Sequence, residues 1–289
     1  MSLAAQALLG ALCALAAVYV WRWIAIERGR AREPTPPSRG ALHPLIGFVT
    51  NYFDTLGVGS FAPTTSVFKL LRLVPDERIP GTLNAGHALP TVAQALIFIA
   101  AVSVDPLTLV LMIAAAVLGA WSGSGVVARL PKRAIQIGMG VALLCAAALF
   151  VLGIVEWIPT GGDDLRLRGA LLWLAVGGNF VLGALMTLGV GLYAPCLILV
   201  SLLGMNPIAA FPIMMGSCAF LMPVAGLRFI AAQRYDLRAA AGLALGGIPG
   251  VLIAAFIVKQ LPLLWLRWLV VAVVLYTAIA MLRAARVRA

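Results

Sequence analysis

Seven long apolar runs constrain the fold of this chain more than any other feature. They lie near residues 3–26, 79–101, 106–128, 134–157, 207–231, 239–258 and 263–282. Each reaches the roughly 20 residues with which an α-helix crosses a hydrocarbon core ~30 Å thick. Because 63% of the 289 residues are hydrophobic and only 11% are charged, we predict an all-α polytopic membrane protein.

The charges and the cysteines exclude several other classes of protein. The formal net charge is +11, but Lys and Arg gather in short connections between apolar runs, where they orient membrane helices, so we expect no nucleic-acid partner. The four cysteines stand singly, without the spacing of a zinc site or a disulfide framework. The HExxH, G-x-S-x-G and Walker sequences do not occur. We therefore predict no enzyme activity, no cofactor and no metal site.

A nine-residue phrase occurs twice in the chain. "TLGVGSFAP" at 55–63 returns as "TLGVGLYAP" at 187–195, with seven identical positions. Further matches at the same offset of 132, such as Phe48 with Phe180 and Pro75 with Pro207, indicate an internal duplication. Glycine allows backbone angles that other residues resist, and proline suits the first turn of a helix. Each phrase is therefore predicted to be a break between two helical segments.

The helical segments around the first break, 44–56 and 63–73, extend only ~20 and ~16 Å, about half a crossing each. If they crossed the membrane as one unit, one basic cluster of the chain would have to face outward. If each broken segment instead forms a V-shaped hairpin, the basic stretches at 72–78, 129–133 and 233–238 all become cytoplasmic. We therefore prefer the hairpin. Each half then holds one hairpin and three crossings, and the second half is inverted relative to the first, as in many secondary transporters.

This topology divides the chain into five parts. Residues 1–26 form a transmembrane anchor that the mature protein keeps, and residues 27–43 form a basic cytoplasmic linker. Residues 44–157 and 167–289 are the two repeats. An extracytoplasmic loop at 158–166, which contains an acidic "GGDD" stretch, separates them.

The doubled phrase, the "DERIPGTLNAGHALP" stretch at 76–90 and the glycine-punctuated helices resemble the TauE/SafE sulfite exporter family of bacterial membrane permeases. The resemblance covers roughly residues 42–285. It implies export or uptake of sulfur-containing anions, such as sulfite, sulfonates or related organosulfur acids, without ATP hydrolysis. One departure is that many members carry a longer glycine run at the break, whereas Ser60 and Leu192 follow the G-V-G here.

The residues at the breaks favour an anion site on physical grounds as well. The second arm of each hairpin begins near Pro63 or Pro195, so free N–H groups and the positive end of the helix dipole point toward the break. Side-chain hydroxyls add hydrogen-bond donors, although a Thr hydroxyl can instead bond to its own helix. The predicted substrate-binding residues at the two breaks are Gly57, Gly59, Ser60, Pro63, Thr64, Thr65, Gly189, Gly191, Tyr193, Pro195 and Cys196.

A polar face on the next helix extends this predicted site. Asn84, His87, Thr91 and Gln94 fall on one side of a helix. We assign Asn84 and His87 to the substrate site, with Ser217 as a smaller counterpart in the second half. The alternative for His87 is a structural hydrogen bond between helices.

Asp54 is the one acidic residue in the interior of the first hairpin. An ionisable side chain at membrane depth is costly and is therefore a functional candidate. We predict that Asp54 takes up and releases a coupling proton, with His87 as its relay. The alternative is that Asp54 caps the exposed N–H groups at the break.

These observations predict a secondary transporter for sulfur-containing anions that crosses the bacterial cytoplasmic (inner) membrane several times. Its partners are the anion, the lipid bilayer and a coupling proton or sodium ion, and a homodimer is compatible with the sequence. The alternative function is an anion channel or a carrier of another small organic anion. A membrane-embedded enzyme has the least support.

Overall fold

The computed structural model describes residues 2–29, 42–126, 132–155, 162–186, 192–260 and 262–286. All secondary-structure elements in these ranges are helices, which confirms the all-α prediction. The helices are α1 (Leu3–Arg28), α2 (Leu42–Thr55), α3 (Phe61–Leu70), α4 (Ile79–Ala101), α5 (Pro106–Val126), α6 (Lys132–Ile154), α7 (Gly169–Met186), α8 (Tyr193–Leu202), η2 (Pro207–Ala209), α9 (Ala210–Ala231), α10 (Leu237–Gln260) and α11 (Leu263–Arg286). Within the described residues, six helices are long and apolar enough to cross a membrane.

The seven apolar runs of the sequence coincide with α1, α4, α5, α6, α9 with η2, α10 and α11. Helix α7 is the first arm of the second broken segment. It was expected to cross only about half of the membrane, but it has 18 residues and is itself a candidate span. The apolar stretch "GALLWLAVGG" lengthens α7 at its N-terminal end. Its counterpart α2 has 14 residues and begins at Leu42, after a sequence segment rich in proline and charge.

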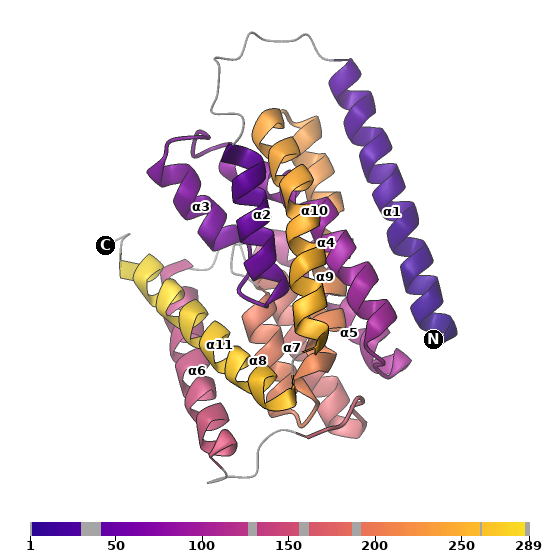
Figure 1. The fold of residues 1–289 in the computed structure, drawn as a ribbon, viewed down its shortest axis with the longest axis vertical. Coiled ribbons are helices and arrows are strands. Elements are labelled where there is room, and N and C mark those ends of the chain that lie inside the picture. The colour runs from indigo at the N-terminus through magenta and orange to yellow at the C-terminus, as the bar shows by residue number, and fades with distance from the viewer. Residues whose placement is uncertain are drawn as a thin grey trace.

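Both broken segments turn back on themselves. At the open end of the first one, the rings of His43 in α2 and Phe68 in α3 lie 6.2 Å apart. In the second, a Cβ at Gly178 of α7 would meet the side chain of Leu199 of α8 at 2.7 Å. Figure 1 shows α2 and α3 together in the upper part of the molecule, on either side of the first break.

Small residues bring the first arm of each hairpin close to a neighbouring helix. Gly242, Gly246 and Gly250 follow each other at four-residue intervals on α10, where a Cβ would collide with the residues of α2. Gly119 of α5 and Gly183 of α7 pack in the same way, each against a backbone carbonyl of the other helix. Such close approach of backbones is how helices associate in a bilayer.

The N-terminal helix α1 packs along the outer edge of the bundle (Figure 1). Only Ala5, Leu12 and Tyr19 of α1 are buried, at seven-residue intervals. The Tyr19 hydroxyl donates a 2.8 Å hydrogen bond to the carbonyl oxygen of Ala85 in α4. One narrow face of α1 is therefore attached to the bundle.

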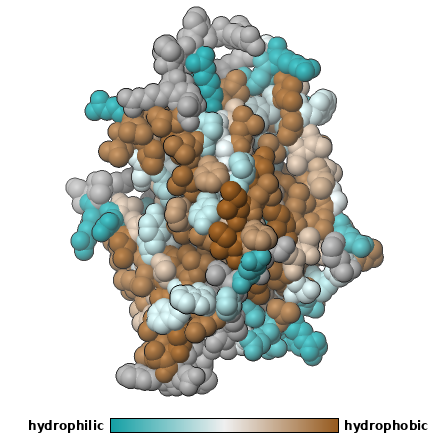
Figure 2. Space-filling view, viewed as in Figure 1, coloured by the Kyte–Doolittle hydropathy of each residue, from teal (hydrophilic) through white to brown (hydrophobic). Residues whose placement is uncertain are grey.

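The surface suits a bilayer. Figure 2 shows hydrophobic residues over most of the middle of one face and strongly hydrophilic residues mainly along its periphery. Contacts between helix ends form two groups. In one group the Tyr235 hydroxyl donates to Glu27 and Lys69 pairs with Asp76. In the other the backbone N–H of Asp105 donates to Leu165, and that of Asn206 donates to Asp164.

Candidate functional site

The first break owes its shape to two glycines. Helix α2 ends at Thr55, after which Gly57 and Gly59 have φ values of +100° and +86°. These left-handed angles are strained for residues with a Cβ. The Gly57 N–H donates to the Asp54 carbonyl at 2.8 Å, and α3 begins four residues later at Phe61. The break therefore reverses the chain and directs the start of α3 into the protein.

A cavity lies at this break, with about 160 Å³ open to the centres of water molecules. A single water needs roughly 10–15 Å³ by the same measure, so the cavity has room for a small ion and several waters. It is lined by Asp54, Val58, Gly59, Ser60, Phe61, Ala62, Thr91, Gln136, Met186, Leu192, Tyr193, Ala194, Cys218, Met222, Tyr276, Thr277, Ala280, Met281 and Ala284. Tyr193 and Cys218 are buried, whereas Ala62 and Ala284 are exposed, so the cavity reaches the surface.

Two helices begin at the wall of this cavity. Phe61 and Ala62 are the first residues of α3, and Tyr193 and Ala194 are the first residues of α8. The backbone N–H groups in the first turn of a helix have no partner within it, and the helix dipole places partial positive charge there. Both helix starts therefore provide donors for a negatively charged ligand, one from each half of the chain.

Asp54 is the only acidic residue among the described lining residues of the cavity, and no described Lys or Arg takes part. Its carboxylate accepts a 2.8 Å hydrogen bond from Nε2 of Gln94. The hydroxyl and the backbone N–H of Ser60, just before α3, also reach it. The Asp54 carboxylate thus lies beside the start of α3, a position compatible with capping of that helix. It also lines the cavity, which the proton-coupling hypothesis requires.

Gln94 joins the two hairpins. Its Nε2 donates to Asp54 and to Oγ1 of Thr55 at 2.8 and 2.9 Å, and its Oε1 accepts a 2.7 Å bond from the Tyr193 hydroxyl. Both amide hydrogens and the amide oxygen are therefore used, which determines the orientation of this amide. A single side chain of α4 links α2 in the first half to α8 in the second.

His87 lies behind the cavity wall. It is completely buried and is not part of the cavity lining. Its Nδ1 lies 3.1 Å from Oδ1 of Asn51, whose own amide nitrogen donates to Gly47, so Nδ1 carries a proton in this arrangement. Its Nε2 lies 3.1 Å from Oγ1 of Thr64, whose hydroxyl donates to the Ser60 carbonyl at 2.8 Å. Thr64 and Phe61, whose ring centroid lies 6.1 Å from that of His87, connect His87 to the break.

The structure brings part of the predicted site together. Asp54, Gly59, Ser60 and Tyr193 line the cavity, and Thr64 and His87 form the layer behind it. The remaining predicted residues of the described chain, which are not among the lining residues, are Gly57, Pro63, Thr65, Asn84, Pro195, Cys196 and Ser217. Gly189 and Gly191 lie outside the described residues.

Two of these outlying residues have other partners. The amide of Asn84 donates to the Pro80 carbonyl of its own helix. The hydroxyl of Ser217 donates to Ile213, also of its own helix, and accepts a 3.3 Å bond from Asn179 of α7. Asn179 donates to the Met112 carbonyl as well, so this polar cluster connects α5, α7 and α9.

Several residues around the site were not predicted from the sequence. The sequence places Gln94 on the polar face of α4 but gives it no role, and nothing in the prediction points to Asn51. Asn51 and Asp54 are three residues apart on α2, and this spacing of polar residues in an apolar segment is a signal that could have identified Asn51. Tyr276 and Thr277 come from α11, and nothing in their local sequence indicates a cavity.

The link between Gln94 and Tyr193 leads to a stability prediction. Gln94→Leu leaves the Tyr193 hydroxyl without its acceptor, and Tyr193→Phe leaves the Gln94 oxygen without its donor. Each change should lower the free energy of unfolding by roughly 1–3 kcal/mol, the usual effect of an unsatisfied buried polar group. The double variant should lose less than the sum of the two, because both changes remove the same bond.

Unfolding of the detergent-solubilised protein measures this coupling. Ser66→Ala is the control, because its exposed hydroxyl bonds only to its own helix. Strictly additive losses in the double variant would show that Gln94 and Tyr193 are not coupled.

Comparison with known proteins adds one finding. A family model described as "Sulfite exporter TauE/SafE" matches residues 2–150, slightly more than half of the chain. The match includes α1, which lies outside the resemblance drawn from residue 42 onward. Comparison with curated proteins and comparison with solved structures find no match.

Proposed function

This chain belongs to the sulfite exporter TauE/SafE family, and on that premise we propose that it is a secondary transporter that moves sulfite, sulfonates or related organosulfur acids across the bacterial cytoplasmic membrane. The family consists of membrane transporters of sulfur anions and not of enzymes.

The observation that carries the proposal is the meeting of two helix starts at one cavity. The first turns of α3 and α8 line it together with Ser60 and Tyr193. Helix starts bind oxyanions through free N–H groups and the helix dipole, without a cationic side chain. Sulfite and sulfonates present several oxygen acceptors to such donors, so this geometry suits their oxyanion groups.

We propose that the two halves are related by inversion. α4 packs against α9, and α6 packs against α11, so two helices of the first half contact their counterparts in the second. The first hairpin arm α2 packs against α10 of the other half, and α7 packs against α5 in the reciprocal way. This reciprocal pairing is what an axis relating two inverted halves produces, and it supports the plan.

Orientation follows from the charges at the helix ends. We place the ends that carry Arg28, Arg72, Arg78 and Arg234 in the cytoplasm, because basic residues near membrane helices favour that side. Asp105 and Asp164 lie at the opposite group of contacts, which we place outside. Arg129 and Arg288 lie outside the described residues.

Labelling from outside the cell tests this topology. In a variant without the four native cysteines, Asp163→Cys should react with a membrane-impermeant maleimide in intact cells. Arg133→Cys, at the start of α6, should react only after the membrane is permeabilised. Labelling of Arg133→Cys in intact cells would overturn the inverted arrangement.

Asp54 is the proposed coupling site. The ionised carboxylate already occupies one of the two helix starts, and a second negative charge in a cavity of low dielectric is strongly unfavourable. Uptake of a proton by Asp54 removes this repulsion, so a proton and an anion bind together. Sodium is the alternative coupling ion. The oligomeric state is a separate question, and the homodimer stays a prediction from the sequence.

Transport in proteoliposomes tests the proposed function. Liposomes loaded with unlabelled sulfite should take up labelled sulfite by counter-flow, and the rate should saturate with concentration. A flux that rises linearly, without counter-flow, would identify a channel. Transport of carboxylates in place of sulfur anions would identify a carrier of another class.

A further inference from the structure

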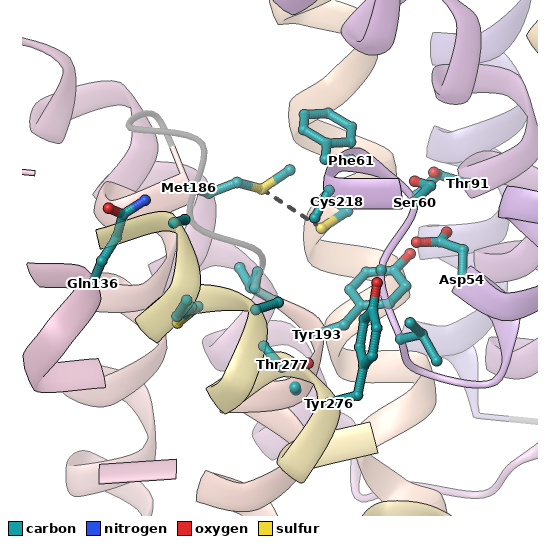
Figure 3. Close-up of a pocket in the computed structure, with 18 of the residues that line it drawn as sticks. Asp54, Ser60, Phe61, Thr91, Gln136, Met186, Tyr193, Cys218, Tyr276 and Thr277 are labelled. Atoms are coloured by element: carbon teal, nitrogen blue, oxygen red, sulfur yellow. Dashed lines mark hydrogen bonds between the residues drawn. The ribbon is translucent and has the colours of Figure 1, made fainter. Parts of the chain in front are cut away.

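Besides the two helix starts, the wall of the cavity contains a group of sulfur-bearing side chains. Four of its lining residues carry sulfur, namely Met186, Cys218, Met222 and Met281. They come from α7, α9 and α11, three helices of the second half. Figure 3 shows Asp54, Ser60, Thr91 and Tyr193 gathered on one side of the cavity, with Cys218 and Met186 extending toward the other.

These sulfur atoms take part in weak hydrogen bonds. The thiol of Cys218 donates to the thioether sulfur of Met186 at 3.7 Å (Figure 3), and the Thr91 hydroxyl donates to the sulfur of Met222 at 3.5 Å. Cys218 is only 2% exposed and Thr91 only 1%. A thioether is a poor acceptor, so both donors are held beside the cavity by partners that a better acceptor would replace.

An oxygen atom is not the ligand group that this wall suits best. Thioether and thiol groups are soft and polarisable, so they make favourable dispersion contacts with a polarisable terminal sulfur. Hydrogen bonds to a charged acceptor are roughly twice as strong as bonds between neutral groups. A terminal sulfur that carries negative charge would therefore displace Met186 as the acceptor of the Cys218 thiol.

We propose that the cavity binds anions that carry a terminal, electron-rich sulfur atom in addition to an oxyanion group, with thiosulfate as the smallest example. The oxyanion group lies at the starts of α3 and α8, and the terminal sulfur lies against Cys218, Met186 and Met222. No bond is formed or broken. This inference rests on the proposed function and names the subclass of sulfur anion that the site prefers.

Binding to the purified, reduced protein tests this preference. Isothermal titration should give a dissociation constant for thiosulfate about tenfold lower than that for sulfite, since one charge-assisted hydrogen bond is worth roughly 1.5 kcal/mol or more. In Cys218→Ala the ratio of the sulfite dissociation constant to the thiosulfate dissociation constant should fall from about ten to near one. Cys218→Ser should not restore it, because a hydroxyl favours oxygen acceptors over sulfur.

Cys145→Ala is the matched control, because this cysteine is exposed on α6 and does not line the cavity. Its ratio of thiosulfate to sulfite affinity should equal that of the unmodified protein. Equal binding of both anions by the unmodified protein, or a Cys218→Ala variant that keeps the full preference, would overturn this inference alone. A failure of every sulfur anion to bind would overturn the proposed function together with it.

Discussion

Asp54→Asn should abolish the dependence of anion accumulation on the pH gradient while it preserves exchange of anion for anion. Asparagine is nearly isosteric, can still accept the hydrogen bond from Gln94, and resembles the protonated carboxyl in its lack of charge. The variant can therefore hold an anion at the helix starts but cannot release a proton. One coupled proton supports about tenfold accumulation per pH unit, and this factor should disappear.

Proteoliposomes with an imposed pH gradient measure the effect, and an alkanesulfonate is the suitable probe because its charge does not change near neutral pH. Asp76→Asn is the control, since this carboxylate is exposed and pairs only with Lys69 at the surface, where ion pairs contribute little. If Asp54→Asn is still driven by the gradient, Asp54 is a cap of α3 and the coupling site lies elsewhere.

Gly59→Val should reduce transport by more than tenfold without preventing membrane insertion. No atom of the described residues lies within 4 Å of a Cβ built on Gly59, so the substitution meets no clash with them, and its φ of +86° opposes the side chain. A β-branched residue in this region costs about 1–3 kcal/mol. The break would relax, and the start of α3 would move away from the cavity.

Two variants separate this strain from a general effect of bulk. Gly10→Val, in α1, also places its side chain in open space but on a regular helix, so transport should be kept. Gly59→Asn should retain more transport than Gly59→Val, because Asn tolerates left-handed angles. Uptake assays at matched expression levels make the comparison. Full transport by Gly59→Val would mean that the break serves only packing. The equivalent test at Gly191 concerns a position outside the described residues.

Much of the fold could be predicted because the bilayer imposes a strong local rule. A span must be apolar over about 20 residues and must satisfy its own backbone, so each run reveals its helix without reference to its neighbours. The break at 56–60 could be predicted as well, because Gly57, Gly59 and Pro63 are local conformational signals. The length of α7 was not expected, because the offset between the halves suggested a short arm.

The candidate site was predictable only where its residues adjoin the break. Ser60 stands just before α3 and Tyr193 is the first residue of α8, so the duplicated phrase indicates both. Gln94 and Cys218 are far from either phrase, and their roles depend on which neighbour each side chain reaches. His87 was expected in the cavity, but Thr64 and the ring of Phe61, 6.1 Å from the His87 ring, lie on its cavity side.

The sequence by itself determined the membrane environment, most of the helices, the duplication and the first broken hairpin, because hydropathy, glycine and proline act over a few residues. Only the tertiary structure decided that the starts of α3 and α8 share one cavity, that Gln94 connects Asp54 with Tyr193, and that sulfur atoms of the second half form the facing wall. These contacts join residues about 40 to 130 positions apart, and they depend on how close α2, α4 and α8 approach. That approach is determined by packing at glycines and other small residues, whose effect is seen only when both helices are in place.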